Sequence, residues 1–136
     1  MGATQIKFTS TAPDKEVRQR LYNSYLRQGF TELMVAIVAK DTPTALGLIE
    51  KGEGLNVKNN VGMTALMLAS LQTYHLMEWV FSNPKPNFIE STVEALIRKQ
   101  VPINERDATG FTALGYAKAR AHRGVIELLE RNGAIE

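Results

Sequence analysis

Apolar residues recur at three- and four-residue intervals along most of the chain, which is the spacing of helices with one buried face. Val17, Leu21 and Tyr25 follow one another at four-residue steps and predict an amphipathic helix over about residues 13–27. The same spacing predicts helices over about residues 32–39, 43–51 and 90–99, and shorter helical segments at 64–69, 75–81, 112–117 and 125–129. The pattern therefore predicts an all-α protein.

A short pattern of glycine, a large apolar residue, threonine, a variable residue and leucine occurs three times. The copies are Gly29-Phe30-Thr31-Glu32-Leu33, Gly62-Met63-Thr64-Ala65-Leu66 and Gly110-Phe111-Thr112-Ala113-Leu114. Their threonines are 33 and 48 residues apart, and 48 is the 33-residue period plus an insertion of 15. A fixed period of this length indicates a repeat architecture.

The far ends of the copies keep the same register. Gly52 and Gly133 each lie 21 residues after a threonine, and Gln100 falls at this position in the middle copy once the insertion is subtracted. With this period and these positions, the chain resembles the ankyrin repeat family over about residues 29–136. The resemblance implies a solenoid of helix-turn-helix units with short hairpin fingers, here residues 56–62 and 104–110.

The sequence departs from the family at the start of each repeat. The family's proline is replaced by Glu32, Ala65 and Ala113, and its histidine by Met34, Met67 and Gly115. These changes affect the hydrogen bonding expected at the repeat starts, but not the fold class. We expect a single ankyrin-like domain over residues 1–136. Residues 1–28 would form a lead-in and a capping helix, 29–61 the first repeat, 62–109 the second repeat with its 15-residue insertion, and 110–136 the third.

Three segments lie outside the regular pattern. The helix over residues 13–27 either caps the open end of the stack, as a solenoid requires, or is a basic helix for an acidic partner. In the middle repeat, Pro84 and Pro86 interrupt any helix, because proline lacks an amide donor and restricts the residue before it. The insertion at 74–99 is therefore a long loop or an additional helix, with residues 90–99 in the place of the second repeat helix. No capping helix follows Val125–Leu129, so we expect an uncovered apolar face there that a partner or self-association would cover.

Composition changes this picture little. The chain is 44% hydrophobic and 22% charged, as is ordinary for a globular domain, and has no cysteine and therefore no disulfide. Its net charge is +2, and the excess lies on residues 1–30, which carry five basic and two acidic residues. No apolar run is long enough to cross a membrane, and residues 1–30 lack the apolar core of a signal peptide. We expect a cytoplasmic protein, and a leader removed before this sequence begins stays open.

The inventory for chemistry is poor. The chain has two histidines, His75 and His122, no pair of them at a metal-binding spacing, and no nucleophile elbow or phosphate-binding loop. His122 falls where the family often has a histidine between its helices, which implies a structural role. We therefore expect no catalytic, cofactor or metal site and no small-molecule substrate.

The remaining candidates lie on the surface that the family uses for binding. Carrying its finger and concave-face positions over implies a partner-binding set of Phe30, Lys58, Asn60, Val61, Met63, Leu71, Gln72, Arg106, Thr109, Phe111 and Arg120. Aromatic residues, methionine and arginine are enriched in protein interfaces. The alternative is that some of these side chains fold back onto neighbouring repeats. A secondary candidate is Trp79, Phe81 and Phe88 in or beside the insertion, unless these aromatics fill the core.

These observations predict a non-catalytic module that binds a protein through the concave face of an ankyrin-like stack, as an inhibitor, scaffold, effector or immunity factor. Two alternatives stay open. One is a structural interaction segment of a larger or homo-oligomeric assembly, joined through the last helix. The other is a weak nucleic-acid binder that uses the basic amino-terminal segment with Lys58, Arg106 and Arg120.

Overall fold

The computed structural model describes residues 15–72 and 88–136, and within these ranges the chain is helical with no strand. The helices are α1 (Lys15–Arg27), α2 (Glu32–Val38), α3 (Thr42–Lys51), α4 (Ala65–Leu71), α6 (Phe88–Arg98), α7 (Ala113–Ala119) and α8 (Arg123–Arg131). The predicted all-α fold class is confirmed. None of the described helices is long and apolar enough to cross a bilayer.

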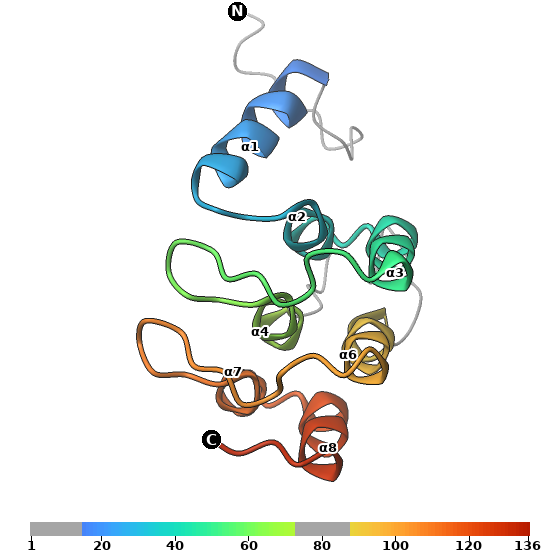
Figure 1. Ribbon diagram of the computed structural model, residues 1–136, viewed down its shortest axis with the longest axis vertical. Helices are drawn as coiled ribbons and strands as arrows, with labels where there is room; N and C mark the ends of the chain where they lie inside the picture. Colours follow the sequence, from blue (N-terminus) through green and yellow to red (C-terminus); the bar gives the residue numbers. More distant parts are fainter. Residues whose placement is uncertain (1–14, 73–87) are drawn as a thin grey trace, which may run out of the picture.

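The helices stack in two columns. Figure 1 shows α2, α4 and α7 one below another in an inner column, with α3, α6 and α8 beside them in an outer column. Helix α6 thus lies where the second helix of the middle repeat was predicted. Whether the insertion before it contains another helix concerns residues 73–87, which lie outside the described ranges. Two fingers extend from the inner column, away from the outer helices (Figure 1).

The repeated threonines begin the inner helices. The Oγ1 atoms of Thr31, Thr64 and Thr112 accept hydrogen bonds from the backbone amides three residues later, at 3.2, 3.3 and 3.1 Å. Such N-cap bonds satisfy amides that have no partner inside the helix. Because the donors are backbone groups, the bonds form although methionine or glycine replaces the family's histidine there.

The repeat spacing also fixes where the outer helices end. Gly52 and Gly133 are left-handed, with φ of 76° and 88°, and Gln100 at the corresponding position has φ of 60°. This conformation ends a helix tightly and suits glycine best. Three positions equated by spacing alone therefore share one backbone conformation, although one of them is not glycine.

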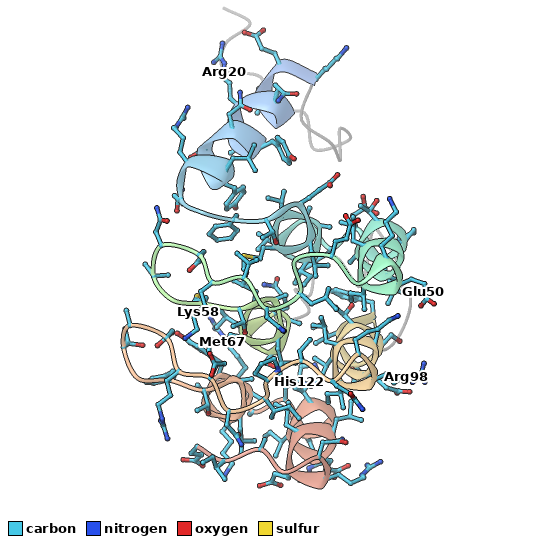
Figure 2. All side chains as sticks on the ribbon, viewed as in Figure 1. Arg20, Glu50, Lys58, Met67, Arg98 and His122 are labelled. Atoms are coloured by element: carbon cyan, nitrogen blue, oxygen red, sulfur yellow. The ribbon has the colours of Figure 1, made fainter. Side chains whose placement is uncertain are left out.

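The core lies between the columns and is densest at α4. Every residue from Ala65 to Ser70 is buried, including Met67, which Figure 2 labels between the stacked helices. In the outer column, His122 begins α8 with its ring largely buried and its Nε2 atom 3.7 Å from Glu90 of α6. Phe88 is 7% exposed and belongs to this core, so its prediction as part of the secondary binding set is wrong and the alternative, core packing, holds for it. Trp79 and Phe81 lie outside the described residues.

Helix α1 is less completely packed than a cap would be. The ring of Tyr25 in α1 lies against the ring of Phe30, with the ring centroids 4.9 Å apart, and the Phe30 amide donates to the Tyr25 carbonyl at 3.1 Å. However, Leu21 in the predicted apolar stripe is 49% exposed. The helix is therefore fixed at its carboxyl end, and its stripe is only partly buried.

Candidate functional site

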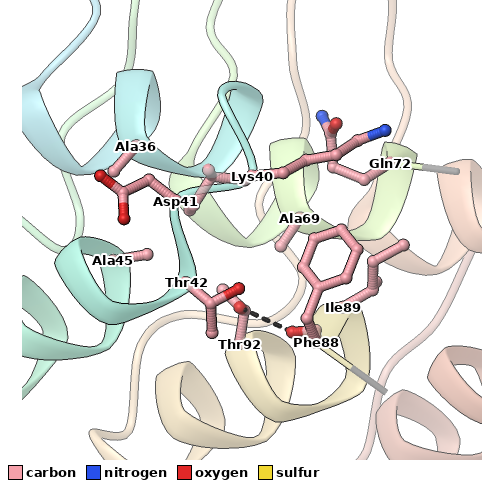
Figure 3. Close-up of a pocket in the computed structure, with 11 residues that line it drawn as sticks. Ala36, Lys40, Asp41, Thr42, Ala45, Ala69, Gln72, Phe88, Ile89 and Thr92 are labelled. Atoms are coloured by element: carbon pink, nitrogen blue, oxygen red, sulfur yellow. Dashed lines mark hydrogen bonds between the residues drawn. The ribbon is translucent and has the colours of Figure 1, made fainter. Parts of the chain in front are cut away.

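The small cavity between the two columns has no room for a cofactor. Figure 3 shows the cavity between the two columns, bounded by Lys40, Asp41, Gln72 and Phe88 among others. Its volume is about 10 Å³, which is room for a single water molecule at most. The described residues also bring together no group of three side chains that could hold a metal ion.

The two fingers form a stacked surface held by the backbone. The Ala108 amide in the second finger donates to the Val61 carbonyl in the first at 2.9 Å. The first finger is bonded in turn to the end of α1, through the amide of Asn60 and the Gln28 carbonyl at 3.0 Å. A Cβ on Gly62 would lie 3.0 Å from the Ala108 nitrogen, so glycine there allows the close approach. These contacts fix both finger tips relative to the helices.

Each finger is shaped by one polar side chain that the sequence analysis did not single out. The Oδ1 atom of Asn59 accepts from the amides of Val61 and Met63 at 3.0 and 2.9 Å. The Oδ1 atom of Asp107 accepts from the equivalent amides two and four residues later, at 2.9 and 3.0 Å. A side chain that bonds its own turn in this way favours the turn conformation. The 48-residue separation of these two residues, equal to that of the threonines, was the signal that could have found them.

Asp107 makes further bonds that connect the second finger to α7. Its carboxylate accepts from the Thr109 hydroxyl at 2.6 Å and from the Tyr116 hydroxyl. Burial opposes the charge, but the hydrogen bonds outweigh it and hold the pKa of Asp107 below its ordinary value. Burial, and then the bond to this carboxylate, raise the pKa of Tyr116. Asp107 of the finger is thus ionised and Tyr116 of α7 is neutral. Their hydrogen bond holds the second finger against α7, which is a structural role.

Several predicted binding residues lie exposed on this surface. Val61 is 54% exposed and Phe111 is 45% exposed, with the Phe111 ring centroid 5.0 Å from that of Tyr116. Arg106 is held beside them, since its guanidinium donates to the carbonyls of Gly110 and Glu136, both at 2.8 Å. We call Val61, Arg106, Phe111 and Tyr116 the finger surface. It combines exposed apolar groups with a positioned cation.

Two charged candidates lie at its margin. Lys58, labelled on the first finger in Figure 2, forms an ion pair with Glu105 of the second finger at 3.1 Å. This pair neutralises much of the lysine's charge. Arg120 is exposed at the carboxyl end of α7.

Other predicted binding residues are occupied by the fold. Met63 is 9% exposed and belongs to the core, so the predicted row of exposed residues at the repeat starts does not include it. Phe30 is half-buried against α1, as described above. The side-chain amide of Asn60 donates to the Arg27 carbonyl at 3.2 Å, and that of Gln72 to the Leu68 carbonyl at 3.0 Å.

The remaining candidates are also partly engaged. Leu71 is half-buried against the core, and Thr109 bonds Asp107. The helix at the end of the stack, where an uncovered apolar face was expected, keeps part of its apolar surface accessible. Val125 and Leu129 are buried, and Ile126 and Leu128 are half-buried against the core.

The structure also contains a groove that the sequence analysis did not predict. It lies between α1 and α2, has a volume of about 610 Å³, and is lined by Lys15, Gln19, Leu21, Tyr22, Tyr25, Val35, Val38 and Ala39. The apolar stripe of α1 was the available signal, but spacing alone predicts burial of a stripe and not the tilt that leaves it open.

Comparison with known proteins supports the fold. No protein-family model and no curated protein matches the chain. Among solved structures, the chain is similar to an ankyrin repeat domain from Acinetobacter baumannii, with 31% sequence identity and a TM-score of 0.65. The match covers 80% of this chain and 50% of that one, so the chain spans half the length of this relative.

Proposed function

Because the chain has an ankyrin-repeat fold, which generally mediates protein–protein interaction, we propose that it is a non-catalytic module that binds a protein partner. The fold is typically not catalytic. We place the contact on the concave side of the stack, centred on the finger surface.

The observation that carries this proposal is the exposure of Val61 and Phe111 on a rigid frame. Both are large apolar side chains, and the backbone around each is bonded to Asn59 or Asp107 and to the neighbouring finger. A surface that is fixed before binding loses little conformational entropy when a partner docks. Aromatic anchors with an adjacent arginine are also the residues that most often dominate binding energy.

The nucleic-acid alternative is less well supported. It would use the basic amino-terminal segment with Lys58, Arg106 and Arg120, but Lys58 is paired with Glu105 and the Arg106 guanidinium donates to two carbonyl groups. The fingers would therefore add few phosphate contacts, and phosphate neutralisation supplies most of non-specific nucleic-acid affinity.

The test is affinity capture from a lysate of source cells, with three forms of the full chain. The double variant Val61→Glu and Phe111→Glu places charge on the finger surface. The control Gly47→Glu places a glutamate on outer helix α3, where an added Cβ meets no atom within 4 Å. Circular dichroism would first establish that all three forms are folded.

We expect the wild type and the control to retain one protein that the double variant loses. The affinity for that protein should fall at least tenfold in the double variant, since truncating a hot-spot residue costs about 2 kcal/mol or more. Equal capture by all three forms would show that the finger surface is not the binding site.

A further inference from the structure

The groove between α1 and α2 lies apart from the finger surface and has its own character. Six of its eight lining residues are aliphatic or aromatic, and the other two are Lys15 and Gln19. Its volume of about 610 Å³ is within the usual range of binding pockets, about 300–1,000 Å³. Leu21 on its wall is about half exposed, so an apolar side chain is accessible from the groove.

The groove exists because α1 and α2 meet at one end only. Tyr25 and Phe30 close that end through their rings, while Figure 1 shows α1 inclined to α2 and leading away from the stack. On α2, the side turned to the stack is buried, whereas Val35 and Val38 are half-buried and line the groove. An apolar groove between two helices can receive the apolar face of an amphipathic helix.

Charge indicates which helix would fit. Helix α1 carries four basic residues and one acidic residue, and Lys15 is the charged residue among the described side chains that line the groove. The single acid, Glu16, is paired with Arg20 at 2.5 Å. A second copy of α1 would bring a further basic helix against this wall, and like charges in contact disfavour association.

We propose that the groove docks an acidic amphipathic helix of a partner protein. Apolar side chains of that helix, one turn apart, would occupy the trough over Leu21, Tyr22 and Val38. Its flanking carboxylates would face the basic wall of α1 near Lys15. This site is separate from the finger surface, so the protein would offer two contact regions on one frame.

Two synthetic peptides of about 16 residues test the proposal on the full chain. Both carry leucines at the spacing i, i+3, i+4 and i+7, which places them on one face of the helix. One has glutamates beside this stripe and the other has lysines. Binding is followed by fluorescence anisotropy of the labelled peptide at low and at physiological salt.

We expect the glutamate peptide to bind about tenfold more tightly than the lysine peptide, with a preference that weakens as salt rises. Leu21→Ser should weaken its binding about tenfold, and Ala39→Arg should block the trough. Lys15→Glu should reduce the preference for the glutamate peptide. These positions are exposed, so the variants should fold, and melting curves would check that they do.

The matched control is Val57→Ser, which removes an equally exposed aliphatic side chain near the first finger and should leave peptide binding unchanged. The double variant Val61→Glu and Phe111→Glu should also bind the glutamate peptide normally, which separates this site from the finger surface.

The proposal is overturned if both peptides bind equally, if neither binds, or if Leu21→Ser and Ala39→Arg bind as the wild type does. It is also overturned if light scattering finds a dimer that Leu21→Ser dissociates, because a second copy would then fill the groove. Binding to anionic phospholipid vesicles in place of the peptide would likewise reject it.

Discussion

Replacing Gln100 with glycine should stabilise the protein. Gln100 has a left-handed backbone with φ of 60°, whereas Gly52 and Gly133 hold the equivalent positions with φ of 76° and 88°. The Gln100 side chain is exposed, and its amide bond to the Ile97 carbonyl at 2.9 Å is a backbone contact that any residue keeps. The substitution therefore removes strain without removing packing.

The expected gain is about 0.5–1 kcal/mol. A side chain in the left-handed region costs roughly 1–2 kcal/mol. Glycine offsets part of this gain, because its freedom in the unfolded chain costs about 0.4–1 kcal/mol on folding. For a domain of this size, the gain corresponds to a rise in Tm of about 2–3 °C.

Urea and thermal denaturation, followed by circular dichroism, would measure the change. The reciprocal variant Gly52→Gln should lose a similar amount, since its added Cβ meets no atom within 4 Å and the cost is strain alone. Gln100→Ala keeps the Cβ and should leave stability nearly unchanged. The reasoning fails if Gln100→Gly lowers the midpoint, or if Gly52→Gln has no cost.

Substitutions at three further positions test other parts of the frame. Gly47→Ala lies in the interior of α3 with open space at its Cβ, and should raise the free energy of unfolding by about 0.8–1 kcal/mol in a urea titration. Leu96→Ala removes a fully buried side chain of α6 and should cost about 2–5 kcal/mol in the same assay. Asp107→Ala leaves two partly buried amides without their acceptor and should cost about 1–3 kcal/mol, whereas Asp107→Asn keeps an acceptor and should cost less. Because folding lowers the pKa of Asp107, ionised Asp107 contributes to the free energy of unfolding in full above its unfolded pKa, near 3.8. This contribution is lost as the pH falls through the lower pKa of the folded state. The melting temperature of Asp107→Asn should therefore depend less on pH below about 4 than that of the wild type.

The features that sequence predicted well are local ones. The capping bonds of Thr31, Thr64 and Thr112 join residues three apart, so a repeated threonine was sufficient to place each helix start. The left-handed conformation of Gln100 was not predicted, but the period equates its position with those of two glycines that share this conformation. The helix starts and the backbone conformation at Gln100 are both determined by residues within a few positions along the chain.

The surface could not be predicted in the same way, because exposure depends on what the neighbouring element covers. Met63 and Phe111 occupy the same place in the repeated pattern, yet one is buried and the other exposed. The glycines before them differ similarly. An added Cβ on Gly62 would meet the next finger, whereas one on Gly110 would meet no atom within 4 Å. A period identifies equivalent positions, but each copy has different neighbours.

The contacts that hold the frame also explain how binding and stability can be separated. The fingers are held by backbone groups and by Asn59 and Asp107, and the inner helices begin at their threonines. None of these contacts uses the side chain of Val61, and the Leu21 side chain lines an open groove. Changes at Val61 or Leu21 should therefore shift stability by no more than about 0.5 kcal/mol, the usual limit for surface positions. A loss of binding at either position, with the unfolding midpoint unchanged, would then report the contact with a partner directly.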